Sequence, residues 1–319
     1  MLGAARRLNL CHASSKQSKT LCRKSWMNPL LLLRGRSAIH SSNNVEQLLE
    51  VSGPSSPLGF GFSAGGLLFP YYQGIVEGLQ EEGFLSHDTP VAGASAGSLI
   101  AACAKSGLTQ EELLDALLRL ARDCRRLGTR KNLGPLLKDI LLDVLPDDIH
   151  ERCTSGNVHI AVTEVQSRFK FRPVVLNSFL SKEDLVEALL TSCHIPWYFN
   201  GKPTTVFREI PHFDGGFTNF LPTLPGVEES IGVCCFPAGQ LGGLRSKIQI
   251  APDTYEPWPY TFRQMLSWAL EPADDEVLIW LMYKGKRDAL TWSAYRKGIL
   301  QAPSPEPSLV LPGSGSFDE

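Results

Sequence analysis

The stretch TPVAGASAGSLIAACA, residues 89–104, decides the fold class. A short apolar run ends in a turn of small residues, GASAG (93–97), and a second apolar segment follows. This order is typical of a buried strand that turns sharply into a helix. Ser95 stands between the two glycines of the turn. It is therefore either a nucleophile presented at the end of a strand or a small residue in an ordinary turn.

The flanking segments repeat the alternation of strand and helix. LGFGFSAGG (58–66) predicts a strand that runs into a glycine-rich turn, and apolar residues at spacings of three and four predict an amphipathic helix over 68–79. TQEE (109–112) is a capping box that opens a helix to about Leu127, and SKED (181–184) caps another. Strands are predicted at NVHIAVTEV, TTVFREIPHFD and ESIGVCCF. Such alternation predicts an α/β fold with a mostly parallel sheet.

Composition narrows the class of protein. The 319 residues, 43% hydrophobic and 20% charged, suit one large domain, and a net charge of −2 argues against a nucleic-acid partner. The eight cysteines form no CxxC pair and no zinc-like spacing with histidine, so we expect no metal and no cofactor. Cys234 and Cys235 lie in an apolar run and are predicted to be buried, reduced thiols.

The amino-terminal segment differs in composition from the rest. Residues 1–44 hold no Asp or Glu but many Arg, Lys and Ser, and the first acidic residue is Glu46. This composition predicts an organellar transit peptide over 1–45, with a chloroplast favoured over a mitochondrion, as in a plant or algal protein. A disordered basic tail is the alternative. We predict a linker at 46–57, a catalytic domain at 58–250, a helical extension at 251–300 and a disordered tail at 301–319.

The pattern G-x-S-x-G is that of a nucleophile elbow, in which small neighbours let the chain turn tightly and expose the serine. The elbow comprises Gly93, Ala94, Ser95, Ala96 and Gly97. A serine nucleophile needs a base, and none of the seven histidines has a triad-like setting in the sequence.

Asp214, in FDGGFTNFLP, is the candidate base, because Gly215 and Gly216 would let the chain turn after a strand; a surface turn is the alternative. Gly65 and Gly66 lie between a predicted strand and helix and could offer N–H groups to an oxyanion. A phosphate loop fits this stretch less well, since no G-K-[ST] follows.

These three motifs in this order resemble the patatin-like phospholipase family, and GASAGSL, TSCHIPWYF and DGGFTNFLP are similar to its adipose-triglyceride-lipase branch. The similarity covers about Leu58 to Leu224. It implies a three-layer α/β/α sandwich with a mostly parallel sheet and a Ser95–Asp214 dyad. It also implies an oxyanion hole at Gly65, Gly66 and Leu67. One position departs from the family's loop, G-G-G-x-[RK]-G, because Leu68 stands where a basic residue is usual.

The resemblance implies a lipid acyl hydrolase that cleaves long-chain esters of triacylglycerol, phospholipid or galactolipid. An acyltransferase or transacylase with the same acyl-enzyme, or a catalytically impaired lipid-binding regulator, is the alternative. Its partner would be a membrane or lipid-droplet surface. Residues 257–298 combine Trp and Tyr with Lys and Arg. Val277, Trp280, Leu281 and Lys284 at helical spacing indicate either an interfacial helix or one packed on the edge of the domain.

Overall fold

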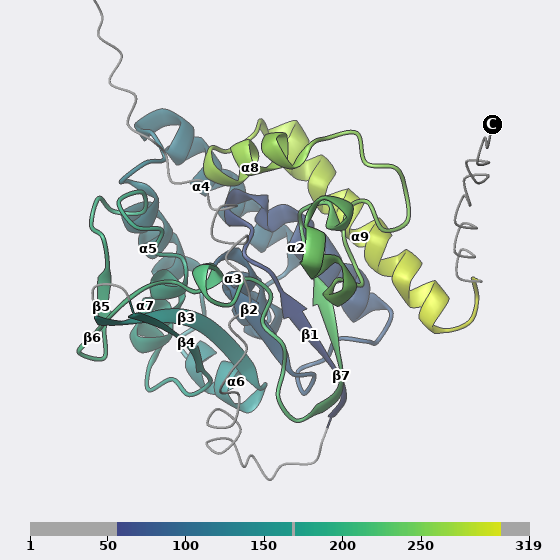
Figure 1. Cartoon of the computed structure of the whole chain (residues 1–319), viewed down its shortest axis with the longest axis horizontal. Helices are drawn as coiled ribbons and strands as arrows, with labels where there is room; N and C mark the ends of the chain where they lie inside the picture. The colour runs from purple at the N-terminus through teal and green to yellow at the C-terminus, as the bar shows by residue number, and fades with distance from the viewer. Residues whose placement is uncertain (1–55, 168–169, 301–319) are drawn as a thin grey trace, which may run out of the picture. The chain divides into compact units, whose positions relative to one another are not determined.

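A computed structural model describes residues 56–167 and 170–300 of the chain (Figure 1). The predicted transit segment, nearly all of the predicted linker and the predicted tail lie outside the described residues. None of the helices in the described ranges is both long enough and apolar enough to cross a membrane.

Seven strands form one mixed sheet in the order β5-β6-β3-β2-β1-β7, with β4 paired to β3 outside this path. The four neighbours β3, β2, β1 and β7 are parallel, whereas β4, β5 and β6 pair antiparallel. The predicted α/β class with a mostly parallel central sheet is confirmed. The strands are β1 Ser56–Phe62, β2 Val91–Ala94, β3 Val158–Ser167, β4 Lys170–Leu176, β5 Thr205–Phe207, β6 Ile210–Asp214 and β7 Val227–Val233.

One strand, β3, is shared by two neighbours along the same edge. Its first residues pair with β2, ending at Ala161 opposite Ala94. Its next residues pair with β6, beginning at Val162 opposite Asp214. The end of β2 and the end of β6 therefore meet at consecutive positions of β3. Ser95 directly follows Ala94, so this register brings Ser95 and Asp214 to the same place.

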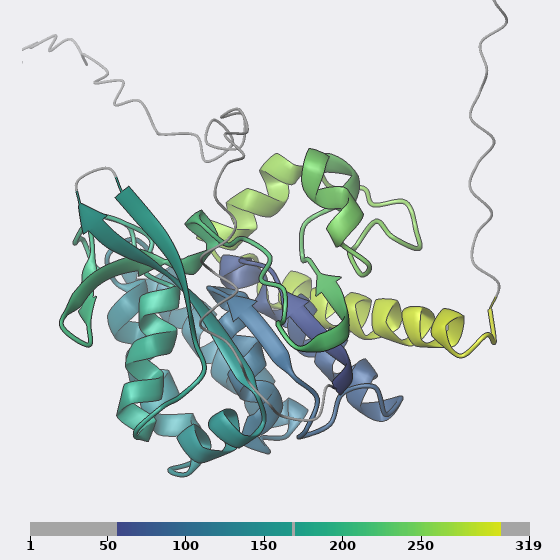
Figure 2. The ribbon, with the colours of Figure 1, turned by 60° about the horizontal axis from the view of Figure 1, so that its bottom comes forward.

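Helix α3 follows β2 after Ser95 alone and β3 follows α6 after two residues, whereas a long connection separates β7 from α8 (Figure 2). Gly107, with φ 79°, ends α3, and the predicted capping box at Thr109 and Glu112 opens α4. The α-helices are α2 Phe69–Glu81, α3 Ala96–Ser106, α4 Gln110–Leu127, α5 Leu133–Val144, α6 Ile149–Ser155, α7 Lys182–Ser192, α8 Phe262–Leu270 and α9 Asp275–Arg296. The short 3₁₀ turns are η2 Gly66–Leu68, η3 Gly215–Phe217, η4 Ala238–Gln240 and η5 Gly242–Lys247.

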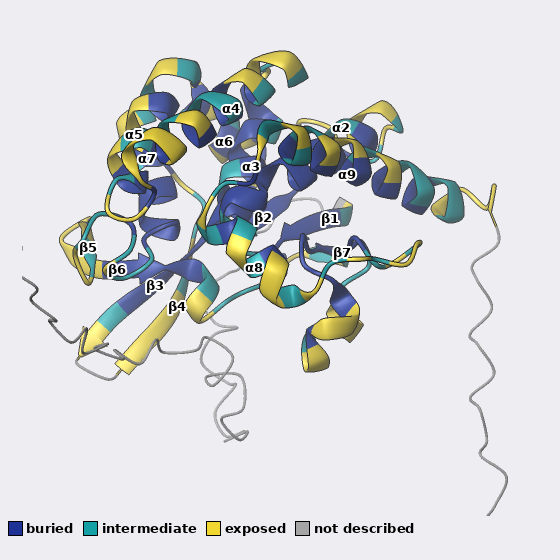
Figure 3. Cartoon of the chain, turned by 90° about the horizontal axis from the view of Figure 1, so that it is seen from above, coloured by how far each residue is buried: buried dark blue, intermediate teal, exposed yellow. Residues whose placement is uncertain are grey.

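The helix expected to be amphipathic, α2, is buried on nearly every side, because α9 packs along it (Figure 3). Glycines allow the two backbones to touch: a Cβ on Gly285 would lie 2.0 Å from the Tyr71 carbonyl oxygen. Leu281 and Lys284 of α9 are buried in the fold, and Trp280 stacks on Trp258. This arrangement matches the packed-helix interpretation of residues 277–284.

The two faces of β1 have different neighbours. Phe60 contacts Trp292 of α9, and Phe62 contacts Tyr72 of α2, in edge-to-face ring pairs. On the other face Gly61 leaves room for the Pro222 carbonyl oxygen, which would lie 2.1 Å from an added Cβ. The segment after η3 therefore crosses β1 closely and fixes the position of the β6–η3 turn.

Candidate active site

Ser95 occupies a strained turn between β2 and α3. Its φ of 52° and ψ of −123° are rarely adopted by residues other than glycine, as in the sharp turn of a nucleophile elbow. The flanking glycines explain how the turn closes. A Cβ on Gly93 would lie 2.0 Å from the Gly97 carbonyl oxygen, and one on Gly97 would lie 2.2 Å from the Phe62 carbonyl oxygen. Only glycine fits at both positions.

A serine from α7 supports the strained turn. The Ser95 N–H donates to the Ser192 hydroxyl oxygen at 2.9 Å, and the Ser192 hydroxyl donates to the Ala161 carbonyl oxygen at 2.7 Å. Both bonds are buried. Ser192 therefore ties the elbow to β3 at the residue where β2 stops pairing.

Asp214 ends β6 and is held from several directions. Its N–H donates to the His194 carbonyl oxygen at 2.9 Å, and its own carbonyl oxygen accepts from the Thr163 hydroxyl at 2.8 Å. Its Oδ1 accepts the Gly216 N–H at 2.7 Å. Gly215 must be glycine, because a Cβ there would lie 2.0 Å from the Ala161 carbonyl oxygen. The D-G-G turn therefore packs directly on the strand that Ser192 holds.

The Ser95 hydroxyl lies beside the Asp214 carboxyl and stabilises its charged form, and each residue is only 5% exposed. Burial raises the pKa of the Asp214 carboxyl to about 7, although the Gly216 N–H and the Ser95 hydroxyl both stabilise the carboxylate. A carboxyl with a pKa near neutrality can both accept and return a proton. The pair can therefore activate a serine hydroxyl chemically.

Cys193 lies beside Ser95 and Asp214, so its thiol is a second possible nucleophile at this site. Burial raises its pKa far above the usual thiol value, an effect that the nearby Ser95 and Ser98 hydroxyls only partly offset. The thiol therefore stays protonated at neutral pH, and a protonated thiol is a poor nucleophile.

The predicted oxyanion loop lies at the same site. Within the described chain no hydrogen bond engages the N–H groups of Gly65, Gly66 or Leu67, and Gly66 and Leu67 line a cavity together with Ser95. Gly66 has φ 55°, and a Cβ there would lie 2.2 Å from the Ala269 carbonyl oxygen of α8. The Leu68 side chain is fully buried in the core, which explains why an apolar residue replaces the basic one.

The cavity beside Ser95 is apolar. The centre of a water-sized sphere can occupy about 80 Å³ of it. Its walls come from one side of α3, α4 and α5, closed at the Ser95 end by Ile195, Tyr198, Phe199 and Ala269. Such a cavity accepts a hydrocarbon chain and excludes charged groups.

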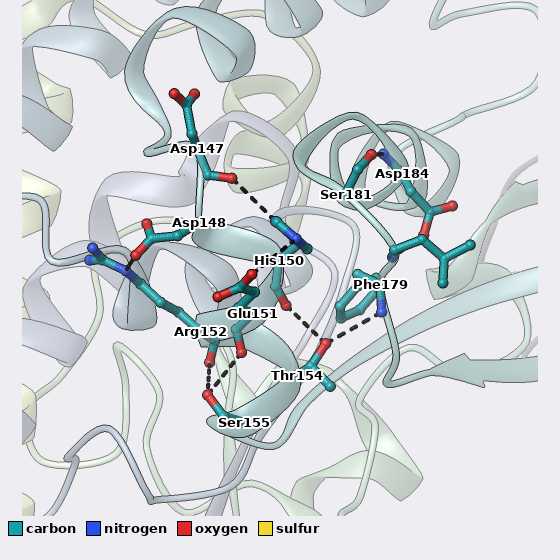
Figure 4. Close-up of polar contacts among 11 residues, drawn as sticks. Asp147, Asp148, His150, Glu151, Arg152, Thr154, Ser155, Phe179, Ser181 and Asp184 are labelled. Atoms are coloured by element: carbon teal, nitrogen blue, oxygen red, sulfur yellow. Dashed lines mark hydrogen bonds and ion pairs between the residues drawn. The ribbon is translucent and has the colours of Figure 1, made fainter.

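Four histidines of the described chain use a ring nitrogen in a polar contact with a partner other than Ser95: His87, His150, His194 and His212. Figure 4 shows His150 on α6, whose Nδ1 lies 3.2 Å from the Asp147 carbonyl oxygen and whose Nε2 lies 3.9 Å from Glu151. Helix α6 leads into the amino end of β3, whereas Ser95 follows the carboxyl end of β2. Because β2 and β3 are parallel, His150 and Ser95 lie toward opposite ends of these strands. The rings of His194 and His212 contact the carbonyl oxygens of Lys202 and Ile210.

The sequence motifs located Ser95, Asp214 and the loop at 65–67, and the structure brings all of them together. Sequence reasoning did not single out Ser192 or Cys193. The available signal was the polar run TSCH at the end of an apolar helix, where side chains commonly bond to neighbouring backbone. Within residues 56–167 and 170–300 no group of three or more His, Cys, Asp or Glu side chains is placed to share a metal ion.

Comparison with known proteins gives a consistent set of similarities. The model of the patatin-like phospholipase family matches residues 62–227. The chain is 30% identical over 276 residues to the omega-hydroxyceramide transacylase of Mus musculus, covering 81% of this chain and 44% of that protein. It is 30% identical over 264 residues to patatin-like phospholipase domain-containing protein 2 of Homo sapiens, covering 79% and 50%.

A third similarity is to a 1-acylglycerol-3-phosphate O-acyltransferase of Mus musculus, with 30% identity over 237 residues, 69% of this chain and 54% of that protein. The chain thus spans about half the length of the curated relatives it matches. The names of these relatives include both a phospholipase domain and acyl transfer.

Proposed function

This chain belongs to the patatin-like phospholipase family, whose members handle acyl groups of lipids, and on that premise we propose that it hydrolyses long-chain acyl esters of glycerolipids. One observation carries the proposal. A strained serine beside a buried carboxyl whose pKa is about 7 lines an apolar cavity. This combines a nucleophile, a base and a binding site for an acyl chain.

The chemistry follows from the positions of the groups. The Ser95 hydroxyl oxygen attacks the ester carbonyl while its proton passes to Asp214. The oxyanion that forms accepts hydrogen bonds from the N–H groups of the 65–67 loop. When the intermediate collapses, Asp214 returns the proton to the leaving alcohol, and an acyl-serine remains. Water then attacks the acyl-serine with Asp214 again as base, releasing the fatty acid and regenerating Ser95.

Active-site labelling tests the assignment. A fluorophosphonate probe should label Ser95, as located by mass spectrometry of the labelled peptide. Ser95→Ala and Asp214→Asn should each lower kcat for a glycerolipid ester by roughly 10³- to 10⁴-fold while the protein stays folded. Labelling at another serine, or near-normal turnover by Asp214→Asn, would exclude the dyad. A panel of triacylglycerol, phospholipid and galactolipid substrates would then identify the lipid class.

Acyl transfer is the second candidate, and one observation favours it. Ser95 and Asp214 are each only 5% exposed, so a bound alcohol can compete with water for the acyl-serine. The reaction products distinguish acyl transfer from hydrolysis. With radiolabelled acyl donor and added glycerol or lysolipid, a transacylase yields mainly the new ester, whereas a hydrolase yields mainly free fatty acid at every acceptor concentration.

We further propose that the protein works at a lipid surface, a membrane or a lipid droplet. Trp197 is 58% exposed and lies two residues beyond Ile195 of the cavity wall, and Phe217 is 48% exposed and follows the D-G-G turn. Aromatic side chains suit the boundary between water and lipid. Trp197→Ala should weaken co-sedimentation with phospholipid vesicles, whereas Trp280→Ala, which changes a tryptophan stacked on Trp258, should not. Equal binding of both variants would contradict this surface.

The basic, acid-poor segment 1–45 supports import into a chloroplast, which we propose as the location of the protein. Residues 1–45 fused to a fluorescent protein in plant cells should accumulate in chloroplasts. A mitochondrial signal would reassign the organelle, and a diffuse cytosolic signal would refute the transit peptide.

A further inference from the structure

The far end of the cavity beside Ser95 carries an inference about specificity, which rests on the proposed function. We propose that Cys103, Leu113 and Val144 set the longest acyl chain that the site accepts. The protein then selects its substrate by the acyl chain and much less by the headgroup. The cavity beside Ser95 is called the acyl pocket from here on.

Three helices build the acyl pocket from apolar stripes. Each stripe has the spacing of three and four residues that places side chains on one side of a helix. The stripe residues are Ala96, Leu99 and Cys103 on α3, Leu113, Ala116, Leu117 and Leu120 on α4, and Leu133, Leu137, Ile140, Leu141 and Val144 on α5. All of these side chains are hydrocarbon except the thiol of Cys103.

The directions of the helices identify the far end. Helix α3 starts at Ser95, and a rise of 1.5 Å per residue places Cys103 about 12 Å further along its axis. Helix α5 starts near Ser95 as well, since the N–H of Gly134 donates to the carbonyl oxygen of Phe199 in the pocket wall. Val144 is the last residue of α5, about 16 Å from Leu133 along its axis.

Helix α4 returns in the opposite direction. It follows α3 after a short loop, so Leu113 in its first turn lies near the end of α3, and the ion pair of Arg119 with Asp143, at 2.7 Å, joins the middle of α4 to the last turn of α5. Cys103, Leu113 and Val144 are therefore the lining residues furthest along the three helices from Ser95.

The chemistry of the walls separates chain from headgroup. An acyl carbonyl at Ser95 sends its hydrocarbon tail between the three stripes, where each added methylene gains burial until the tail reaches the far end. A phosphate or sugar cannot enter, because it would lose its hydration without finding partners among these side chains. The headgroup must stay outside the stripes, beside the partly exposed Ile195 and Tyr198.

Ester hydrolysis by the full-length protein tests the length limit. Leu113→Phe and Val144→Phe place a ring in the far end, and Leu114→Phe, on the neighbouring side of α4 and absent from the pocket wall, is the matched control. Both pocket variants should lower kcat/KM for p-nitrophenyl palmitate by about tenfold or more relative to p-nitrophenyl butyrate. Leu113→Ala should move the preferred chain length upward. If the palmitate-to-butyrate ratio of both pocket variants equals that of Leu114→Phe, the inference is wrong.

A binding assay keeps this inference separate from the proposed catalysis. In the Ser95→Ala background, fatty acids of increasing length displace a fluorescent fatty acid, and thermal denaturation confirms that each variant is folded. A shorter length limit in Leu113→Phe supports the inference even if the wild type hydrolyses no ester. An unchanged limit in both pocket variants overturns it even if Ser95 proves to be the nucleophile.

Discussion

Ser192 and Ser95, 97 positions apart in sequence, are joined by a buried hydrogen bond of 2.9 Å from the Ser95 N–H to the Ser192 hydroxyl oxygen. The same hydroxyl donates to the Ala161 carbonyl oxygen of β3. A single side chain thus links the strained turn, the strand beneath it and the end of α7. Its neighbours Cys193 and His194 contact Ser95 and Asp214, so this short segment supports both members of the pair.

Ser192→Ala should reduce activity through geometry. The change leaves the Ser95 N–H and the Ala161 carbonyl oxygen buried without a partner, so the turn can shift. We expect kcat to fall by about ten- to a hundredfold with little change in KM. Ser106→Ala is the matched control, because Ser106 is a buried serine that also bridges two backbone groups, at the other end of α3. Ester kinetics that are equal in the two variants would show that Ser192 is only structural.

The pH dependence of activity should report Asp214. The base must be ionised to accept the serine proton, and its pKa is about 7. kcat/KM should therefore be low in acid, rise through an apparent pKa near 7 and level off above it. Steady-state kinetics from pH 5 to 9 measure this profile. A profile that is flat across this range would exclude Asp214 as the base.

The same carboxyl should make the protein less stable as pH rises. An unfolded aspartate has a pKa of about 3.9, so between about pH 4 and 7 the folded protein holds a proton that the unfolded chain releases. The free energy of unfolding falls across this window, by up to about 4 kcal/mol above pH 7. Asp214→Asn removes this penalty, so it should raise Tm at pH 8 by clearly more than at pH 5. Thermal unfolding of the wild type and Asp214→Asn at both pH values measures this difference, and an equal gain at pH 5 and pH 8 would contradict it.

Gly66→Ala should damage the oxyanion loop. Gly66 has φ 55°, which alanine adopts poorly, and the added Cβ would lie 2.2 Å from the Ala269 carbonyl oxygen. The loop must move, and we expect kcat to fall by roughly 10²- to 10³-fold. Gly243→Ala, where no atom lies within 4 Å of an added Cβ, is the control. Full activity of Gly66→Ala would remove this loop from the mechanism.

The sequence predicted the local parts of the fold better than the way they meet. The ends of α3 and α4 could be located because Gly107 and the Thr109–Glu112 capping box are local signals. Helix α5 and strand β4 were not predicted, although Leu137 and Ile140 have helical spacing. Strand β4 includes Pro173, which is unusual inside a sheet and hides the pattern of a strand.

In the candidate site, too, the individual turns could be predicted from the sequence but the contacts between them could not. Glycines next to Ser95 and Asp214 mark the two turns in the sequence, because at each turn another backbone segment comes too close for a side chain. The approach of the two side chains depends on the pairing of β6 with the second half of β3, which no short motif encodes. Ser192 escaped notice for a related reason, because its partners are backbone groups from distant segments.

The shared strand β3 determines which parts of this chain can change length during evolution. A shift of β6 by one residue would turn Asp214 to the opposite side of the sheet, because side chains alternate along a strand. Insertions within β6 or the second half of β3 should therefore be rare among homologous chains. The loop between α7 and β5 lies outside this pairing and can change length beyond Lys202, whose carbonyl oxygen is the last to contact Trp197 and His194. Sequence variation should concentrate there, where new contacts with a lipid headgroup could arise without disturbing the pair.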